Sequence, residues 1–416
     1  GGLRPLPDGR GGKRDYPTQP IHELIMSGEN VARYADLVGF ADTDKSKRLH
    51  SMLATYKRAL NRERFVATVA ALEPDGVETV YDVTVSEVHA FDANGLYVHN
   101  CAEQPLPPYG CCCLGSINLT NFVSAPFTAQ AAFDFERFGA TVETSVRMLD
   151  NVLDATAWPL PQQYEEAMNK RRIGLGYTGL GDALIMLCRR YDSEAARELA
   201  AKISEAMRDY AYRASSSLAR ERGAFPLFNA DMYLSGTSFA TRLPQEIKAL
   251  IRKQGLRNSH LLSIAPTGTI SLAFADNASN GIEPPFSWTY TRKKRMADGT
   301  LQEFPVEDFA WRLYRHLVAH GVLPVAAGGG DALPEYFVTA LEISAAAHEA
   351  MVAAVAPYID TSISKTVNVP ENYPYADFQG LYFDAWKAGL KGLATYRPNS
   401  VIGSVLSVEP QSQPQD

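Results

Sequence analysis

The sequence predicts an α/β protein preceded by a small all-β unit. Three observations support this prediction: helical and strand-like segments alternate after residue 101, the apolar period changes to two between residues 65 and 99, and 416 residues with 46% hydrophobic content can bury a large core. Alternating helices and strands favour a sheet that is covered by helices.

The composition excludes several classes of function. The net charge of -7 argues against a basic surface for nucleic acid, and no apolar run approaches a membrane span, so neither partner is expected. Five cysteines, three of them consecutive, do not form the disulfide framework of an extracellular protein. We expect a cytoplasmic enzyme. Because the chain begins with Gly1 and not with Met, we also expect a fragment or a processed product.

Residues 1–47 are predicted to be a linker followed by a helical remnant. Residues 1–20 contain five Gly and four Pro, which is typical of a linker, and apolar stripes predict helices near 31–38 and 49–60. The basic run at 45–48 is interpreted as a solvated helix start, with contact to nucleic acid as the alternative.

Residues 48–100 are predicted to contain the all-β unit. Apolar residues alternate at 65–69, 80–85 and 96–99, which predicts short strands. The pair Asn94-Gly95 between the last two strands predicts a tight turn.

Residues 101–399 are predicted to form the α/β domain, and residues 400–416 a disordered tail. One helix is capped at Asp192 or Ser193 and closed by Gly223. In the second predicted strand, Ile363, Lys365, Val367 and Val369 share one face. The predicted helices are 135–153, 193–222 and 345–356, and the predicted strands are 260–264 and 361–369.

The bond between Asn100 and Cys101 carries a chemical signal. The side-chain nitrogen of Asn100 can attack its own backbone carbonyl, which forms a succinimide and breaks the bond to Cys101. The imidazole of His99 can assist this step by supplying a proton, and a thiol at the next position can accept an acyl group. An ordinary hairpin before a loop is the alternative.

The residues before this bond resemble the C-terminal splicing blocks of inteins, which have a Hint-type fold. The resemblance rests on Val-Tyr-Asp-Val-Thr-Val at 80–85, the Asn94-Gly95 turn and the terminal Val-His-Asn. No intein start or early Thr-x-x-His segment precedes residue 82, so splicing would need an upstream intein and extein fragment as a partner. The resemblance implies assisting roles for Asp82 and His89 and C-terminal chemistry at His99, Asn100 and Cys101.

The residues after the bond predict different chemistry. Cys101 and Glu103 are two residues apart, so on an extended loop both side chains point to one face. As a thiyl radical the sulfur could abstract hydrogen while the carboxylate accepts a proton, and Cys112 could donate electrons as half of a disulfide-forming pair. Three adjacent cysteines make a poor metal site, so no metal is expected, and buried apolar packing is the alternative for 111–113.

The segment 101–119 closely resembles the active-site region of the large, catalytic chain of ribonucleotide reductases, with the adenosylcobalamin-dependent (class II) branch as the better match. The resemblance reaches about residue 399. It implies the second half of a ten-stranded α/β barrel with a finger loop. Further similar segments follow in family order at 171–184, 258–271, 280–284, 363–370 and 389–399.

The resemblance also implies roles and partners. Cys101 would carry the radical that removes the ribose 3′-hydrogen, Glu103 would be the base on the 3′-hydroxyl, and Cys112 would belong to the redox pair. The substrate would be a ribonucleotide, with a diphosphate favoured, the cofactor adenosylcobalamin, and the reductant thioredoxin or a glutaredoxin-like protein. A homodimer is implied for the complete enzyme.

A loop rich in hydroxyl groups is predicted to bind the substrate phosphate. Gly permits close backbone approach there, and a following helix would direct its N–H groups at the anion. An ordinary helix cap is the alternative. The loop consists of Pro266, Thr267, Gly268, Thr269, Ile270 and Ser271.

The sequence departs from the family pattern in two respects. The family has Asn two residues before the radical cysteine, where this chain has His99. The partner redox cysteine and the first half of the barrel would lie upstream, so we expect the isolated chain to be inactive. Thr395-Tyr396 lacks the adjacent tyrosine pair that relays a radical from an iron-containing subunit, which favours cobalamin.

Other patterns are weaker. Residues 174–179 spell a dinucleotide fingerprint, but a polar stretch precedes them where a buried strand is required. His316 and His320 are spaced like metal ligands, yet an exposed helix face is favoured. Lys365 and Tyr396 either line the active site or pack in the barrel.

The sequence predicts two alternative functions for this chain. The first is reduction of ribonucleotides to deoxyribonucleotides for DNA synthesis, once the missing half is joined. The second is protein processing, in which cleavage before Cys101 is this chain's only chemistry. A glycyl-radical lyase is disfavoured because the residues after Arg397 do not resemble a glycyl loop.

Overall fold

The computed structural model describes residues 3–7, 13–17, 35, 43–55, 82–84, 90–93, 96–99, 104–111, 113–295, 301–326, 329, 332–369, 372–396 and 406–407. They belong to two compact units, Gly1–Val77 and Glu78–Asp416. In the first unit, α2 (Thr43–Thr55) contains the basic run, and β1 (Leu3–Pro7) pairs with β2 (Lys13–Pro17). This pairing departs from the predicted linker, because a ladder is built from main-chain groups and needs no alternating side chains.

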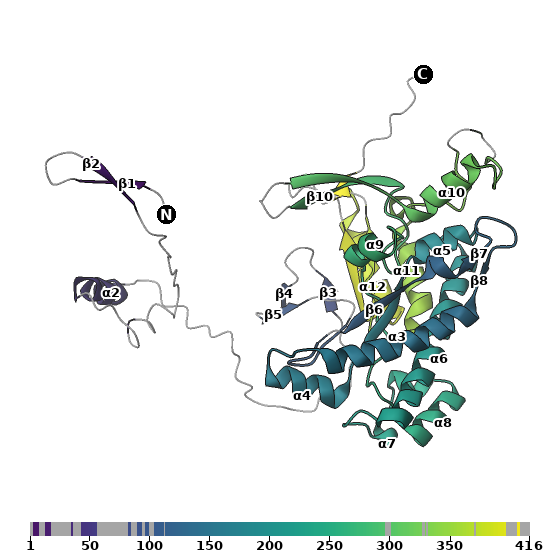
Figure 1. Ribbon diagram of the computed structural model, residues 1–416, viewed down its shortest axis with the longest axis horizontal. Coiled ribbons are helices and arrows are strands. Elements are labelled where there is room, and N and C mark those ends of the chain that lie inside the picture. Colours follow the sequence, from purple (N-terminus) through teal and green to yellow (C-terminus); the bar gives the residue numbers. More distant parts are fainter. Residues whose placement is uncertain are drawn as a thin grey trace. The chain divides into compact units, whose positions relative to one another are not determined.

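The second unit is built on parallel strands (Figure 1). β6 (Leu114–Asn118) pairs with β9 (Gly174–Thr178), and β13 (Gly392–Tyr396) lies between β12 (Thr366–Asn368) and β3 (Asp82–Thr84). Parallel bridges from Leu262 to Leu175 and from Ile264 to Ile363 join the two groups. The ladder therefore runs from β6 through 260–264 to β3, and within the described residues its two ends are not paired with each other.

Helices cover this ladder, and the three helices predicted within residues 101–399 are confirmed as α3 (Phe135–Ala155), α6 (Glu194–Arg222) and α11 (Ala345–Val355). Ser193 caps α6 by accepting a hydrogen bond from the N–H of Ala196. None of the described helices is long and apolar enough to span a bilayer. The other elements are α4 (Pro161–Lys170), α5 (Leu180–Met186), α7 (Ala230–Tyr233), α8 (Gln245–Gln254), α9 (Gly268–Phe274), α10 (Phe309–Ala319), α12 (Tyr375–Lys387), β4 (Ala90–Ala93), β5 (Leu96–His99), β7 (Val123–Ser124), β8 (Ala132–Phe133), β10 (Thr289–Arg295), β11 (Leu301–Glu307), β14 (Leu406–Ser407) and 3-10 turns at Leu119–Phe122, Phe239–Arg242, Ala340–Glu342 and Ala356–Tyr358.

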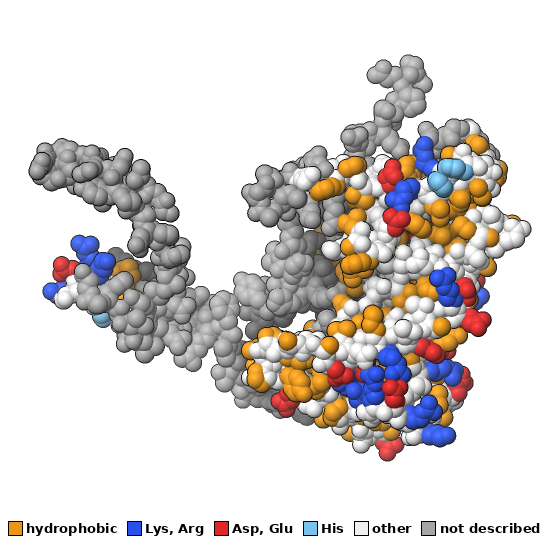
Figure 2. All heavy atoms as spheres, viewed as in Figure 1, with side chains coloured by type: hydrophobic (Ala, Val, Ile, Leu, Met, Phe, Trp, Pro, Cys, Tyr) orange, Lys and Arg blue, Asp and Glu red, His pale blue; other side chains and the backbone are white. Residues whose placement is uncertain are grey.

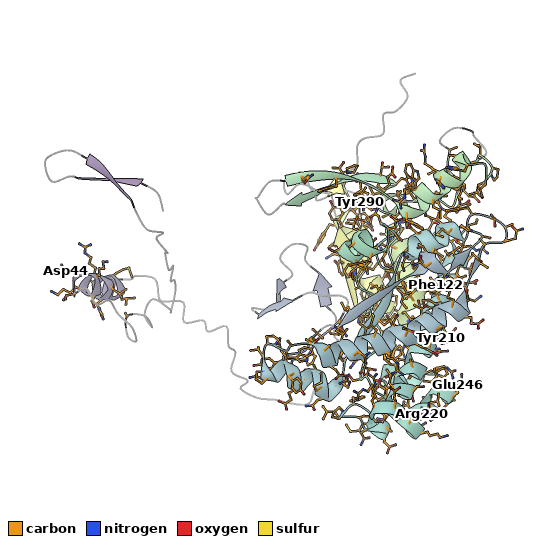
Figure 3. The ribbon with its side chains drawn as sticks, in the orientation of Figure 1. Asp44, Phe122, Tyr210, Arg220, Glu246 and Tyr290 are labelled. Carbon is orange, nitrogen blue, oxygen red and sulfur yellow. The ribbon has the colours of Figure 1, made fainter. Side chains whose placement is uncertain are left out.

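Two glycines permit close contacts that set the packing. A Cβ at Gly139 of α3 would lie 2.3 Å from the ring of Tyr210 on α6, which is labelled in Figure 3. A Cβ at Gly176 of β9 would lie 2.2 Å from the carbonyl oxygen of Ser263. The glycines at 174 and 176 are therefore inside a buried strand, whereas a dinucleotide fingerprint places its glycines after one.

A buried ionic cluster joins α3 and α6 to the chain entering β9. The carboxylate of Asp150 is fully buried and accepts hydrogen bonds from Arg171 at 2.8 Å and from Asn258 at 3.1 Å. Arg222 and Arg257 approach its other oxygen at 3.2 and 3.3 Å. Since a buried charge is tolerated only when it is paired, this cluster fixes where the strand begins.

A second apolar cluster holds α10 against α5. It contains Phe127, Ile185, Tyr314 and Phe337. The antiparallel pair β10–β11 leads into α10, and β14, from the segment that was predicted to be disordered, pairs with β10.

Two buried carboxyl groups meet at this junction and hydrogen-bond to each other: Asp182 on α5 and Asp308 at the start of α10. Asp182 also accepts from the N–H groups of Ser279 and Ala310, each at 3.1 Å. Burial raises the pKa of Asp182 to about 6, and burial with the nearby Asp182 charge raises the pKa of Asp308 well above its usual value. A hydrogen bond between two carboxyl groups needs a proton, so the pair shares one.

We predict that the contribution of this pair to the free energy of unfolding falls as the pH rises from about 4 to above 6. The folded state keeps a proton that the unfolded chain releases near the ordinary pKa of 3.8, so raising the pH favours unfolding. Asp308→Asn supplies an amide donor that does not depend on pH. The free energy of unfolding, measured with urea at about pH 5 and about pH 8, should therefore change between the two pH values by about 2 kcal/mol less in the variant than in the wild type.

The control is Asp134→Asn, which alters the exposed cap of α3 and should keep the wild-type pH profile. An unchanged profile in Asp308→Asn would contradict the shared proton.

Candidate functional site

The predicted radical and redox residues, Cys101, Glu103 and Cys112, lie outside the described residues. The described neighbours, 104–111 and 113, lead directly into β6. The described part of the candidate site consists of the strands and loops around these residues.

Of the described residues next to Cys101, Glu103 and Cys112, Gln104 is buried and Cys111 and Cys113 are partly buried. Burial raises the pKa of the Cys113 thiol to about 11 and also raises that of Cys111, where Arg172 acts in the opposite direction. Both thiols are therefore protonated and unreactive at neutral pH. The Gln104 amide is 2% exposed, and neither of its polar atoms has a partner among the described residues. Because an unpaired buried amide is costly, we expect a group outside the described residues to bind it.

The predicted phosphate loop follows the strand at 260–264, at its carboxyl end. The hydroxyls of Thr267 and Ser271 are buried and already bonded, to Thr178 at 2.8 Å and to the carbonyl of Ala278. Thr269 is exposed, and a Cβ at Gly268 would have a single neighbour, Asn280 Nδ2, at 3.8 Å. The loop therefore offers an anion the Thr269 hydroxyl and main-chain N–H groups, not all three hydroxyls.

The loop at 279–283 connects the ends of three strands. The carbonyl of Ser279 accepts from the N–H of Gly179, just after β9, at 2.7 Å. The N–H of Gly281 donates to the Thr267 hydroxyl at 2.8 Å, which ties in the phosphate loop. The carboxylate of Glu283 reaches β12. Through these hydrogen bonds the 279–283 loop holds the predicted phosphate loop, 266–271, in position.

Glu283 binds two groups of β12 at once. One oxygen accepts from the ammonium of Lys365 at 2.5 Å, and the other accepts from the N–H of Thr366 at 2.6 Å. Lys365 is fully buried, so burial lowers its pKa while Glu283 opposes that shift. Of the two roles considered for Lys365, the structure supports packing within the sheet.

The other candidate residues, His316, His320 and Tyr396, have local contacts of their own. His316 and His320 lie exposed on α10, with the Nδ1 atom of His320 2.8 Å from the carbonyl of His316. The described residues contain no group of three potential metal ligands. The carbonyl of Tyr396 accepts from the N–H of Val369, which extends the pairing of β12 and β13.

The predicted splicing residues are only partly described. Asp82 lies in β3 and His99 ends β5, whereas His89, Asn100 and Cys101 lie outside the described residues. β4 and β5 pair from Ala90 with His99 to Ala93 with Leu96, which is the register that a two-residue turn requires, while Asn94 and Gly95 themselves lie outside the described residues.

Glu283 and Ser279 were not predicted to have a role in the site. Both lie in or beside the Asn-Gly-Ile-Glu-Pro segment, which was noted only as similar to the family. A Glu in a stretch with little other charge was the available signal, because a buried carboxylate needs a partner. Nothing local indicated that the partner is Lys365.

A parallel sheet covered by helices, with polar loops at the carboxyl ends of its strands, defines an α/β class of protein whose candidate site lies at those ends. The profile of the family described as "Ribonucleotide reductase, barrel domain" matches residues 80–396. The chain belongs to this family.

The chain is similar to three vitamin B12-dependent reductases. It is 38% identical over 315 residues to the ribonucleoside-diphosphate reductase of Mycobacterium tuberculosis, covering 74% of this chain and 42% of that protein. It is 33% identical over 317 residues to the ribonucleoside-diphosphate reductase of Thermoplasma acidophilum, covering 74% of this chain and 38% of that protein. It is 30% identical over 399 residues to the ribonucleotide reductase of Streptomyces clavuligerus, covering 86% of this chain and 41% of that protein. The chain thus spans about two fifths of the length of these relatives.

We predict that Glu283→Gln lowers the free energy of unfolding by about 3–5 kcal/mol, because it leaves the buried Lys365 charge without a counter-ion. Adding Lys365→Met should restore much of the loss, since both charges are then absent. Urea denaturation measures each difference.

The matched control is Glu246→Gln, labelled in Figure 3, which breaks the exposed pair with Arg213 and should cost less than about 1 kcal/mol. A cost for Glu283→Gln equal to that of the control would contradict the role of this ion pair.

Proposed function

We propose that the chain is the C-terminal half of the catalytic subunit of an adenosylcobalamin-dependent ribonucleotide reductase, in which it completes a ten-stranded barrel. The observation that carries the proposal is the family match, together with relatives of about 30–38% identity that are named as B12-dependent reductases. The activity belongs to the complete protein, since the chain spans only part of those relatives.

The chemistry proposed for this chain begins at Cys101. Its sulfur radical takes the 3′-hydrogen of the ribose and becomes a thiol, while Glu103 accepts the 3′-hydroxyl proton. The 2′-hydroxyl then leaves as water. Cys112 and an upstream cysteine supply two electrons and two protons and form a disulfide; one proton leaves in the water, and the other, with the two electrons, gives the new C2′–H bond. Glu103 returns its proton to the 3′-oxygen, and the hydrogen on Cys101 returns to C3′, which restores the sulfur radical. Thioredoxin or a glutaredoxin-like protein would reduce the disulfide.

The substrate is proposed to be a ribonucleoside diphosphate whose phosphate binds to Thr269 and the N–H groups of the 266–271 loop. That geometry is compatible with the exposed hydroxyl of Thr269 and the open space beside Gly268. The 279–283 loop would hold these donors in place before the substrate arrives, which reduces the entropy cost of binding.

The exposed apolar surface of α9 fits the proposed cofactor. Ile270 and Phe274 lie one turn apart beside Thr269 and are 38% and 86% exposed. A flat macrocycle could cover such a pair, so we propose that Ile270 and Phe274 pack against the corrin ring. When bound, adenosylcobalamin supplies the radical that oxidises the Cys101 thiol.

The test uses the complete reductase, in which residues 101–416 follow their natural upstream half. Cys101→Ala should lower deoxyribonucleotide formation from a ribonucleoside diphosphate, adenosylcobalamin and a dithiol by at least about a thousandfold, because no other group can carry the radical. Cys188→Ala, at a half-buried thiol on another loop, is the control and should retain activity. Turnover that survives Cys101→Ala would refute the assignment. The isolated chain should show no turnover.

A second function is proposed for the junction before Cys101. The β4–β5 hairpin ends at His99, directly before Asn100, as C-terminal cleavage of an intein requires. Asn100 would cyclise with proton transfer from His99, assisted by Asp82 and His89, and an upstream fragment would supply the missing half for splicing.

Mass spectrometry of the purified chain, incubated with and without thiol, tests this cleavage. We expect a fragment that begins at Cys101, and we expect Asn100→Ala to abolish it because cyclisation needs the side-chain amide. Asn399→Ala, remote in sequence, should cleave normally. Persistence of the intact mass after long incubation would rule out autonomous cleavage.

A further inference from the structure

A cavity of about 150 Å³ lies where the chain enters β12 and β13. Its apolar lining includes Val352, Ile359, Ile363 and Leu390. None of its lining residues belongs to the radical, redox or phosphate-binding sets proposed above. A cavity of this size holds a molecule about as large as benzene, so a nucleotide does not fit.

Two cationic side chains, Lys391 and Arg242, line the cavity, and none of its described lining residues carries a carboxylate side chain. The Lys391 ammonium donates to the carbonyl oxygens of Asp360, at 2.8 Å, and Thr361. These acceptors are neutral, so they orient the ammonium without cancelling its charge. An ammonium has three N–H groups, which leaves one for a ligand.

The carboxylate of Asp360, whose charge acts on Lys391, binds other groups. It accepts from the N–H groups of Leu261 and Leu262 and from the hydroxyl of Tyr212, each at 2.8 Å. Burial lowers the pKa of Lys391, Asp360 opposes this shift, and the positive charge of Arg242 adds to it. Both cations line this one cavity, so an anion placed in it would face two positive charges.

Arg242 differs from arginines that form surface ion pairs. Acidic and basic side chains lie next to one another on the face shown in Figure 2, and pairs such as Arg147–Glu221, at 2.6 Å, occur in this unit. Arg242 instead stacks on Phe239, with its guanidinium carbon 5.4 Å from the ring centre. This stacking fixes the side chain at the cavity and leaves its N–H groups available for a planar anion.

We propose that the cavity binds a small organic anion. Its carboxylate or phosphate group lies between Lys391 and Arg242, and its body, no larger than one ring, packs on Val352, Ile363 and Leu390. The two cations attract the charge, and the apolar lining excludes a fully hydrated ion. This site is independent of the proposed reductase chemistry.

Isothermal titration of the full chain at low salt tests the proposal with three probes: benzoate, inorganic phosphate and the uncharged benzamide. Binding of benzoate or phosphate, with benzamide at least about tenfold weaker, supports the site and identifies the preferred head group. Absence of binding by both anions would overturn it.

Variants of the two cationic residues test whether the anion binds in this cavity. Arg242→Gln, at an exposed side chain, and Lys391→Met should each weaken the bound anion by about tenfold, the loss expected for one charged hydrogen bond. The control Arg252→Gln removes an exposed arginine of α8 that does not line the cavity and should leave the affinity unchanged. Equal affinities in the wild type and Arg242→Gln, or an equal loss in Arg252→Gln, would overturn the proposal.

Discussion

The double hydrogen bond of the Glu283 carboxylate with the Lys365 ammonium and the Thr366 N–H is the interaction on which the candidate site depends. It ties the 279–283 loop to β12, while the same loop bonds to the end of β9 and to Thr267. Lys365 is fully buried, so the ammonium and carboxylate stabilise the fold only while both are present. The 266–271 loop, the predicted phosphate site, is thereby held by three strands that are far apart in sequence.

A second buried carboxylate, Asp150, plays the corresponding part where α3 and α6 meet the chain entering β9. Arg171 and Asn258, which begin two of the family-like segments, both bind Asp150. Those segments therefore combine residues that hold the scaffold with residues that reach the proposed substrate. The resemblance of a whole segment does not separate the two kinds of residue, whereas their hydrogen-bond partners do.

Local patterns predicted the regular elements well. The helices α3, α6 and α11 follow apolar periods and caps that lie within the elements themselves, and the face made by Ile363, Lys365, Val367 and Val369 is buried as expected. The β1–β2 pairing and the Asp182–Asp308 pair were not predicted. Both depend on groups that come together from separate segments. Neither produces a regular spacing of apolar residues along the sequence, which is the pattern that predicts helices and strands.

The sequence by itself determined the family, the order of its segments, and the residue types at the proposed radical loop and at the Asn100–Cys101 bond, because that chemistry depends on neighbours along the chain. The tertiary structure decided which polar groups remain available. Thr267 and Ser271 use their hydroxyls internally while Thr269 is exposed, and Lys365 is neutralised by Glu283. The physical reason is that desolvation and pairing are set by distant residues, so they exist only once the strands are assembled.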